Sequence, residues 1–381
     1  MEWKEVLLSE FLEFNPKRTI KKNEVARKIT MDLLIPHSKQ IYNFKYEPYT
    51  GGAKFSNGDT IMARITPCLE NGKHAYVSCL NEGEIAYGST EYIVLCGKNG
   101  VSDNEFVYYL SHTPQFVNTA IKSMVGSSGR QRAQVPVLEN LIMPVPVNLS
   151  DQRKIAGILS ALDSKIENNN KINANLEAQA EALFKSWFVD FTPFKDQPFV
   201  DSELGPIPQG WKVGKLGDIC TFKRGKNLLS KNAIDEGVPV VAGGLSPSCY
   251  HNQANTSAPV VTVSGSGANA GFMRMYHVDV WASDCSFIDV SCDYLYFVYC
   301  FLSVNRRLLK HAQTGAVQPH VKPADIHDFD VVIPEEDIVK AFQSIIKELL
   351  TKVGVNEKEN QRLAALRDTL LPKLMSGEIK L

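Results

Sequence analysis

The chain has 381 residues, which is too many for one ordinary hydrophobic core and fits two domains with connecting elements. Hydrophobic residues make up 44% of the sequence and charged residues 22%, a composition typical of a folded globular protein rather than of a disordered chain. The 41 lysines and arginines balance 42 acidic residues, so any surface that binds nucleic acid must be a local basic patch.

Membrane insertion and export are not indicated. The longest apolar run, residues 294–302, is about half of the roughly 20 residues that a membrane-spanning helix needs. The charged start of the chain leads into no long apolar stretch with a cleavage site, so we expect a cytoplasmic protein. The eight cysteines are scattered without a C-x-x-C pair, which favours free thiols over a zinc site or a disulfide framework.

The sequence contains one unit written twice. Trp3 and Lys4 recur as Trp211 and Lys212, and residues 105–109 resemble residues 293–297. The spacing between matching positions shrinks along the globular parts, which indicates insertions in loops of the first copy. We therefore predict two related domains.

Within each copy, short β-rich runs alternate with turns that contain glycine, asparagine and serine, a pattern typical of a mixed α+β domain. The clearest of these runs are residues 60–65, 91–96 and 259–264. One helix is predicted in each copy, at 103–124 and at 293–311, with Asp103 and Ser291 as N-cap residues.

Each copy ends in a segment whose apolar residues are spaced alternately four and three apart, the pattern of a coiled-coil seam. The first seam extends from Ile155 to Trp187 and the second from Phe342 to Leu374. Both carry two polar layers at matching places, which we expect to fix the register of the pair: Asn169 and Asn173 in the first seam, Asn356 and Asn360 in the second. Antiparallel packing needs no long return of the chain, so we predict an antiparallel pair with approximate two-fold symmetry. The alternative is that each helix packs on its own domain.

The predicted division is therefore a first globular domain, a central helix, a linker, a second globular domain and a C-terminal helix. Their boundaries are residues 1–150, 151–188, 189–210, 211–334 and 335–381.

No catalytic signature survives inspection. The sequence has no G-x-x-x-x-G-K-[ST] phosphate loop, no glycine-rich dinucleotide turn, no Asn/Asp-Pro-Pro-aromatic tetrapeptide of amino-methylating DNA methyltransferases and no histidine spacing for a metal site. Gly265-Ser266-Gly267 is better explained as a turn. We expect neither catalytic residues nor a bound metal.

Two polar, basic loops occupy corresponding places in the copies, at residues 126–134 and 313–322. Arginine can contact guanine and glutamine can contact adenine with two hydrogen bonds, each worth roughly 1 to 3 kcal/mol of discrimination. Basic clusters at 17–28 and 223–231 would hold phosphates without reading bases. The candidate DNA-binding residues are Lys17, Arg18, Lys21, Arg64, Ser127, Ser128, Arg130, Gln131, Arg132, Arg224, Lys226, Ser264, Ser266, Asn269, Thr314, Gln318 and His320. The alternative for each is an ordinary solvated surface group.

Several motifs together resemble those of type I restriction-modification specificity subunits. The first helix opens with Asp151-Gln152-Arg153-Lys154-Ile155 and closes with Leu183-Phe184-Lys185-Ser186-Trp187-Phe188. The second unit is entered through Gly205-Pro206-Ile207-Pro208-Gln209-Gly210-Trp211, and the last motif, near the end of the sequence, is Leu370-Leu371-Pro372-Lys373-Leu374 followed by Ser376-Gly377-Glu378-Ile379. The match is weaker at 334–338, where no glutamine follows the acidic residues, and at Arg367, which interrupts the second seam.

This resemblance implies two target-recognition domains, each reading one half of a bipartite DNA site, separated by an antiparallel coiled coil of two long helices. It further implies that the helices set the spacer and dock two methyltransferase subunits, and that the assembly recruits two translocase-nuclease subunits. S-adenosylmethionine, ATP and magnesium would belong to those partners, and this chain would be non-catalytic. Roughly 32 residues of paired helix at about 1.5 Å each would span on the order of 50 Å, or about 14 base pairs.

Two other functions remain open at this point. A hydrolase or nuclease with duplicated domains could use His311, Asp284 and Cys285. A protein-interaction scaffold would use its helices and bind no nucleic acid, although the basic loops count against it.

Overall fold

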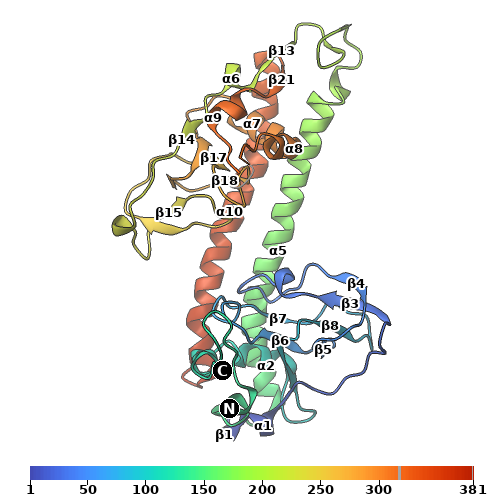
Figure 1. Cartoon of the computed structure of the whole chain (residues 1–381), viewed down its shortest axis with the longest axis vertical. Helices are drawn as coiled ribbons and strands as arrows, with labels where there is room; N and C mark the ends of the chain where they lie inside the picture. Colours follow the sequence, from blue (N-terminus) through green and yellow to red (C-terminus); the bar gives the residue numbers. More distant parts are fainter. Residues whose placement is uncertain (316–318, 380) are drawn as a thin grey trace. The chain divides into compact units, whose positions relative to one another are not determined.

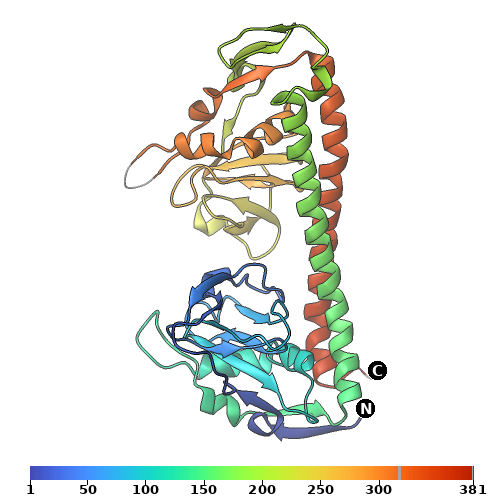
Figure 2. The same ribbon diagram turned by 90° about the vertical axis from the view of Figure 1, so that its right-hand side faces the viewer.

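The structure is a computed structural model that describes residues 1–315, 319–379 and 381. Its contacts divide the chain into two compact units, which we call the first unit (Met1–Asn168 with Glu359–Leu381) and the second unit (Asn169–Lys358). Each unit combines a mixed α/β globular part with half of each of two 40-residue helices, α5 (Leu149–Phe188) and α10 (Glu336–Met375), as Figures 1 and 2 show. The predicted α+β class is confirmed, while the predicted domain boundaries stay a prediction.

In the first unit, three groups of strands surround short helices. β1 (Trp3–Leu7) pairs with β10 (Ile142–Pro146), and the two four-stranded sheets have the orders β2-β9-β6-β7 and β4-β3-β8-β5. Their strands are β2 (Leu12–Phe14), β9 (Tyr92–Gly97), β6 (Thr60–Ala63), β7 (His74–Tyr76), β4 (Lys45–Pro48), β3 (Val25–Ile29), β8 (Ala86–Gly88) and β5 (Lys54–Phe55). The short helices are α1 (Leu8–Phe11), α2 (Asn104–Leu110), α3 (Pro114–Lys122) and α4 (Val135–Glu139), with a 3-10 turn at Met31–Leu33.

The second unit repeats this order. β13 (Lys212–Lys215) pairs with β21 (Asp330–Ile333), and the sheets run β14-β20-β17-β18 and β16-β15-β19. Their strands are β14 (Lys223–Arg224), β20 (Cys285–Ile288), β17 (Val260–Ser264), β18 (Met273–Tyr276), β16 (Cys249–His251), β15 (Val238–Val241) and β19 (Trp281–Ala282). The remaining elements are α6 (Leu216–Ile219), α7 (Leu295–Val304), α8 (Arg306–His311), α9 (Pro323–His327), 3-10 turns at Thr192–Phe194 and Ser230–Asn232, and the linker hairpin of β11 (Phe199–Val200) and β12 (Ile207–Pro208). The predicted duplication is confirmed.

The long helices pack against each other within each unit, and they run antiparallel, as predicted. In the first unit, Ile155 and Leu159 of α5 share one hydrophobic core with Leu371 and Leu374 of α10. In the second unit, Asn173 contacts Asn356 and Phe188 contacts Phe342, so residue numbers rise along α5 as they fall along α10. The predicted polar layer is also present, because the Asn356 amide donates to the side-chain oxygen of Asn173 at 2.7 Å in a buried position. Asn169 is buried as well.

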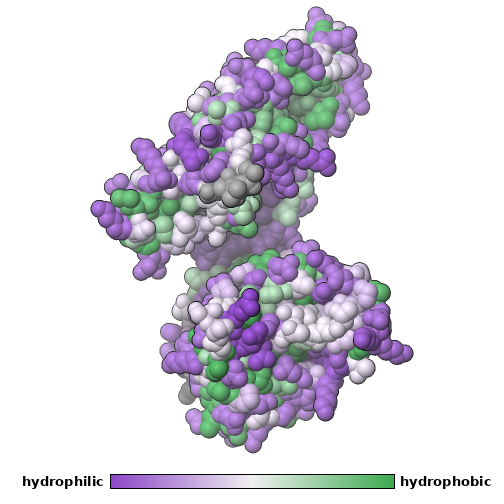
Figure 3. All heavy atoms as spheres, in the orientation of Figure 1, coloured by the Kyte–Doolittle hydropathy of each residue, from purple (hydrophilic) through white to green (hydrophobic). Residues whose placement is uncertain are grey.

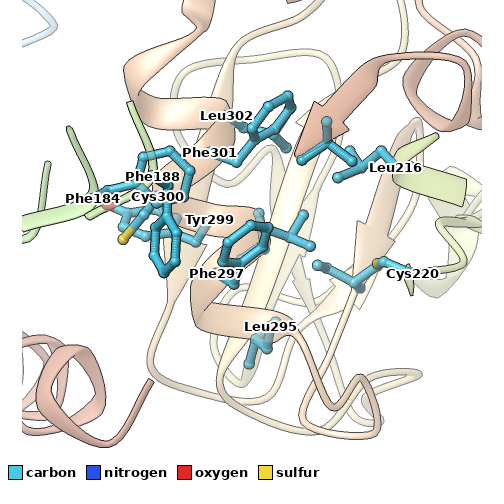
Figure 4. Packing of buried hydrophobic residues seen from close by; sticks show 14 of the residues in the cluster. Phe184, Phe188, Leu216, Cys220, Leu295, Phe297, Tyr299, Cys300, Phe301 and Leu302 are labelled. Carbon is cyan, nitrogen blue, oxygen red and sulfur yellow. The ribbon is translucent and has the colours of Figure 1, made fainter. Parts of the chain in front are cut away.

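The two units use different chemistry where α5 meets the globular part. In the second unit the contact is aromatic: Figure 4 shows Phe184 and Phe188 of α5 beside Phe297 and Phe301 of α7, with ring centroids of the Phe188–Phe297 pair 5.1 Å apart. In the first unit an apolar core that includes Ile155 and Leu159 is joined by buried polar contacts. The buried Lys39 ammonium lies against the Glu105 carboxylate and donates to the Ser160 hydroxyl of α5 at 3.0 Å.

The predicted helices at 103–124 and 293–311 are each two helices. α2 ends before Thr113, which caps α3, and Pro114 begins α3 because proline lacks the N–H that a continuous helix would need there. Asp103 is confirmed as an N-cap, since its carboxylate accepts from the backbone N–H groups of Glu105 and Phe106 at 3.0 and 3.1 Å. Ser291 was wrongly predicted as a cap.

The Ser291 hydroxyl donates instead to the Asp289 carboxylate, and α7 begins later, at Leu295. Asn305 separates α7 from α8. The apolar spacing of the sequence predicts neither the later start of α7 nor the break before α8.

Gln152, the glutamine of the motif that opens α5, is fully buried and joins three backbone groups. Its side-chain oxygen accepts from Asp103 N–H at 2.8 Å, and its amide donates to the carbonyls of Val101 and Pro146, both at 3.0 Å. The second unit lacks this glutamine at the matching position, yet Gln343 of α10 serves the corresponding end of α7. Its oxygen accepts from Tyr296 N–H at 3.1 Å and its amide donates to the Asp293 carbonyl at 2.7 Å.

Replacing Gln152 with alanine is expected to destabilise the first unit by about 2 kcal/mol, because the change strips partners from buried backbone groups. Urea unfolding followed by circular dichroism measures the effect. Ser164→Ala, an exposed position on the same helix, is the matched control and should leave the unfolding free energy unchanged. Equal stability of Gln152→Ala and Ser164→Ala would contradict the anchoring role.

Candidate nucleic-acid interface

The two predicted recognition loops occupy equivalent places in the fold. In the first unit, Val125 and Arg132 close a loop by exchanging backbone hydrogen bonds of 3.1 and 2.9 Å. In the second unit, Thr314 and His320 do the same at 3.0 and 2.8 Å. Each loop is also bridged to the chain just beyond the central strand of its sheet, through Ile65 after β6 and Ser266 after β17.

The tips of these loops are accessible. Ser127, Ser128 and Arg130 are exposed, whereas Gln131 is half-buried and its side-chain amide donates no hydrogen bond to the residues that the structure describes. Gly126 has a φ of +138°, and a Cβ there would meet the Arg130 carbonyl at 2.9 Å, so the turn needs glycine. Thr314 is exposed and His320 half-buried, while Gln318 lies outside the described residues.

An acidic residue lies at the foot of both loops, directly before β9 and β20. Glu91 and Asp284 are equivalent because their carbonyls accept from Arg64 N–H at 2.9 Å and from Gly265 N–H at 3.0 Å, the residues that follow β6 and β17. The Glu91 carboxylate accepts from Nε of Arg132 at 2.9 Å and from its Nη2 at 2.6 Å, and this hydrogen bonding raises the pKa of the Arg132 guanidinium.

The Asp284 carboxylate accepts from Nη2 of Arg224 at 2.5 Å and from the Ser266 hydroxyl. Three predicted contact residues thus meet at acidic groups. The predicted contact residues included neither acid. The sequence of a basic loop shows its cations. The carboxylates that pair with them lie far away along the chain and are recognised only in the folded structure.

The basic cluster at 17–28 is divided between exposed and internally paired cations. Lys17 and Lys21 are exposed, but Arg18 forms a 2.5 Å ion pair with the buried Asp59. Arg27 is buried, pairs with Glu84 at 3.0 Å and lies 4.4 Å from the Phe44 ring centre. Lys28 pairs with Glu47 at 2.6 Å, and this hydrogen bond raises the pKa of Lys28. The structure therefore leaves Lys17 and Lys21 better placed for phosphate than Arg27 or Lys28.

Hollows lie beside both sets of residues. One of about 460 Å³ in the first unit is lined by residues 15–19, 52–54 and Val94, and so includes Lys17, Arg18 and Lys54. One of about 310 Å³ in the second unit is lined by Arg224, Gly265, His320, Lys322 and Pro323. Figure 3 shows mostly hydrophilic residues on the face that it presents.

The remaining predicted residues are distributed unevenly. Lys226 is exposed, and the Asn269 amide donates to the Gly243 carbonyl at 3.3 Å near the second loop. Ser264 is buried in β17 and does not lie at the surface. The Arg64 guanidinium donates to the Ala133 carbonyl at 3.2 Å and is half-buried below the first loop.

The residues considered for a hydrolase do not form a nucleophilic site. Cys285 is buried, its thiol points to the Val241 carbonyl at 3.6 Å, and burial raises its pKa to about 12. A nucleophilic cysteine needs the opposite shift. Asp284 is held by Arg224, and His311 lies at the end of α8.

Within residues 1–315, 319–379 and 381, no three histidine, cysteine or acidic side chains gather as metal ligands, and all eight cysteines are free thiols. None of the helices described is both long and apolar enough to cross a bilayer.

Comparison with known proteins defines the class. The family model of the type I restriction modification DNA specificity domain matches residues 1–178 and 208–367, once for each copy, and the chain belongs to this family. The type I restriction enzyme MjaIX specificity subunit of Methanocaldococcus jannaschii is 31% identical over 307 residues, covering 74% of this chain and 70% of the relative. The HindI specificity subunit of Haemophilus influenzae is 24% identical over 429 residues, covering 89% and 90%.

A solved structure shares the fold. The type I restriction-modification S subunit from M. genitalium aligns over 98% of this chain and 96% of its own, with a TM-score of 0.56 and 18% sequence identity. The tandem specificity domains and these relatives give this chain a DNA sequence-specificity function within a type I restriction-modification system, which confirms the predicted family and function.

Proposed function

We propose that each unit reads one half of a bipartite DNA target and that α5 and α10 set the distance between the halves. The observation that carries this proposal is the repeated loop: both units place a polar, cation-bearing loop beside the end of the same strand, with an arginine held at its foot. The two units share one fold but carry different side chains on their loops, as expected if they bind two different half-sites. Contacts with phosphate would come from exposed cations such as Lys17, Lys21 and Lys226.

We also propose that catalysis belongs to partner subunits in the cytoplasm. Two methyltransferase subunits would dock on the long helices and two translocase-nuclease subunits would join the assembly, bringing S-adenosylmethionine, ATP and magnesium with them. On α10, Ile345, Val355 and Leu366 are 41%, 55% and 47% exposed and are candidate contacts for this docking. The similarity to specificity subunits supports a non-catalytic role for this chain.

The test is to express the chain with its methyltransferase partner and map methylated adenines across the host genome. We expect two short defined sequences separated by an unread spacer. The double variant Arg130→Ala/Arg132→Ala should lower the sequence preference at one half of the target by roughly 10- to 100-fold, the effect of losing a base contact. The double variant Arg224→Ala/His320→Ala should lower the sequence preference at the other half only.

The controls use the same partner and the same map. Lys226→Ala should weaken binding equally at all sites, as expected for a phosphate contact. Relaxation of the same half by both double variants would contradict the assignment of one half to each unit. Methylation or cleavage of DNA by the purified chain alone would contradict the non-catalytic role.

A further inference from the structure

Glu91 and Asp284 occupy equivalent positions in the two units. Each directly precedes a sheet strand, and those strands differ in sequence between the units, Tyr92–Gly97 against Cys285–Ile288. The acid is repeated although its surroundings have changed. In both units its carboxylate holds an arginine.

The arginine comes from a different element in each unit. In the first unit it is Arg132, at the end of the recognition loop. In the second unit the loop carries His320 at that place, and the arginine is Arg224 of β14. What the two units share is therefore the acid and a guanidinium beside it, at the foot of the loop.

The hydrogen bonds of Arg132 leave a defined pair of donors. Nε and Nη2 each give one hydrogen to Glu91, and Nη1 gives one to the Arg130 carbonyl at 3.2 Å. A guanidinium has five N–H groups, so one hydrogen on each terminal nitrogen has no acceptor among the residues that the structure describes. The O6 and N7 atoms of guanine can accept two hydrogen bonds from one guanidinium, and Nη1 and Nη2 would be the donors here. The side chain is 42% exposed, so these donors are accessible.

In the second unit a glycine makes room for the held arginine. A Cβ on Gly265 would lie 2.6 Å from Nη1 of Arg224 and 3.0 Å from the Asp284 carboxylate. Arg224 therefore lies close over the strand end, with its side chain 46% exposed. A side chain at position 265 would therefore displace the arginine, the carboxylate or both.

Stability alone does not account for these pairs. Ion pairs that are this exposed add little to the folding free energy, and a carboxylate at a DNA-facing site repels phosphate. We propose that Glu91 and Asp284 are positioning residues, which hold Arg132 and Arg224 so that each contacts one guanine with two hydrogen bonds. This inference rests on the proposed function and adds to it that each half-site contains a guanine read in this way.

The test uses Glu91→Gln and Asp284→Asn in the complex with the methyltransferase partner, with methylated sites mapped as above. Glu91→Gln is expected to lower the preference for guanine at one position of one half-site by roughly 10- to 100-fold and to leave every other position unchanged. Asp284→Asn should do the same in the other half. Glu91→Asp, which keeps the charge, should restore part of the preference. Urea midpoints measured on each variant should stay at the wild-type value.

Arg132→Lys provides a second route should Glu91→Gln fail to fold. Lysine keeps the charge but lacks the planar fork, so it should lose the same guanine preference with overall affinity retained. Gly265→Ala should weaken the guanine preference of the other half by displacing Arg224. If wild type reads a bipartite site and none of these variants changes a single position, the positioning role is wrong. If wild type with its partner reads no bipartite site, the proposed function itself is wrong.

Discussion

Replacing Arg367 with methionine is expected to lower the unfolding free energy of the first unit by about 3 to 5 kcal/mol. Nη1 of Arg367 on α10 lies 2.7 Å from the Asp163 carboxylate on α5, and their side chains are 15% and 8% exposed. The other carboxylate oxygen accepts from the Tyr109 hydroxyl at 2.6 Å. Methionine would leave a buried negative charge with one neutral donor, which is the costly way to break such a pair.

Urea unfolding of three variants measures this effect. Arg362→Met, an exposed arginine on the same helix, should change the unfolding free energy by less than about 0.5 kcal/mol. Asp163→Leu/Arg367→Met removes both charges and should recover most of the loss, because apolar groups can replace a buried ion pair at little cost. Wild-type stability of Arg367→Met would show that the pair is not needed.

Acidification from pH 7.5 to pH 4.5 is expected to destabilise the first unit by about 2 to 3 kcal/mol through His112 alone. Burial lowers the pKa of His112 to about 4, against an ordinary value of 6.5. Its Nδ1 lies 2.8 Å from the Tyr108 carbonyl, and its ring packs on His74, whose pKa burial also lowers. As the pH falls, His112 is protonated near pH 6.5 in the unfolded chain but only near pH 4 in the folded chain. The free energy of unfolding therefore keeps its full value above pH 6.5 and decreases below it.

The measurement compares urea unfolding at the two pH values in wild type and in His112→Gln. The variant should be less stable at pH 7.5 but should lose less on acidification, by the amount that His112 contributes. His311→Gln, an exposed histidine on α8, should show the wild-type pH dependence. An equal acid loss in wild type and His112→Gln would contradict this origin of the pH dependence.

The two long helices and their pairing could be predicted because they depend on patterns between residues that are close together in the sequence. Residues 155 to 187 and 342 to 374 repeat an apolar spacing that depends on neighbours three and four positions away, and the matching asparagines follow from direct comparison of the copies. The antiparallel direction followed from the connection between the helices. The two seams meet through Asn173 and Asn356 as this reasoning required.

What the sequence concealed depends on residues far apart along the chain. Arg367 looks like an interruption of the seam until Asp163, 204 residues away, is found beside it. Gln343 replaces the missing glutamine from one helical turn further along α10 and therefore falls outside a position-by-position match. The acids that hold Arg132 and Arg224 were missed for the same reason.

A protein that carries one architecture twice risks packing a helix of one copy onto the wrong globular partner during folding. The contrast between the polar contact around Lys39, Asp163 and Arg367 and the aromatic contact around Phe184 and Phe297 opposes that error. A misplaced helix half would set a carboxylate against phenyl rings, or a phenylalanine against an ammonium group that has lost its acid. Buried charges thus distinguish the two contacts, and each half of α5 should pack during synthesis on the globular part that supplies its partners.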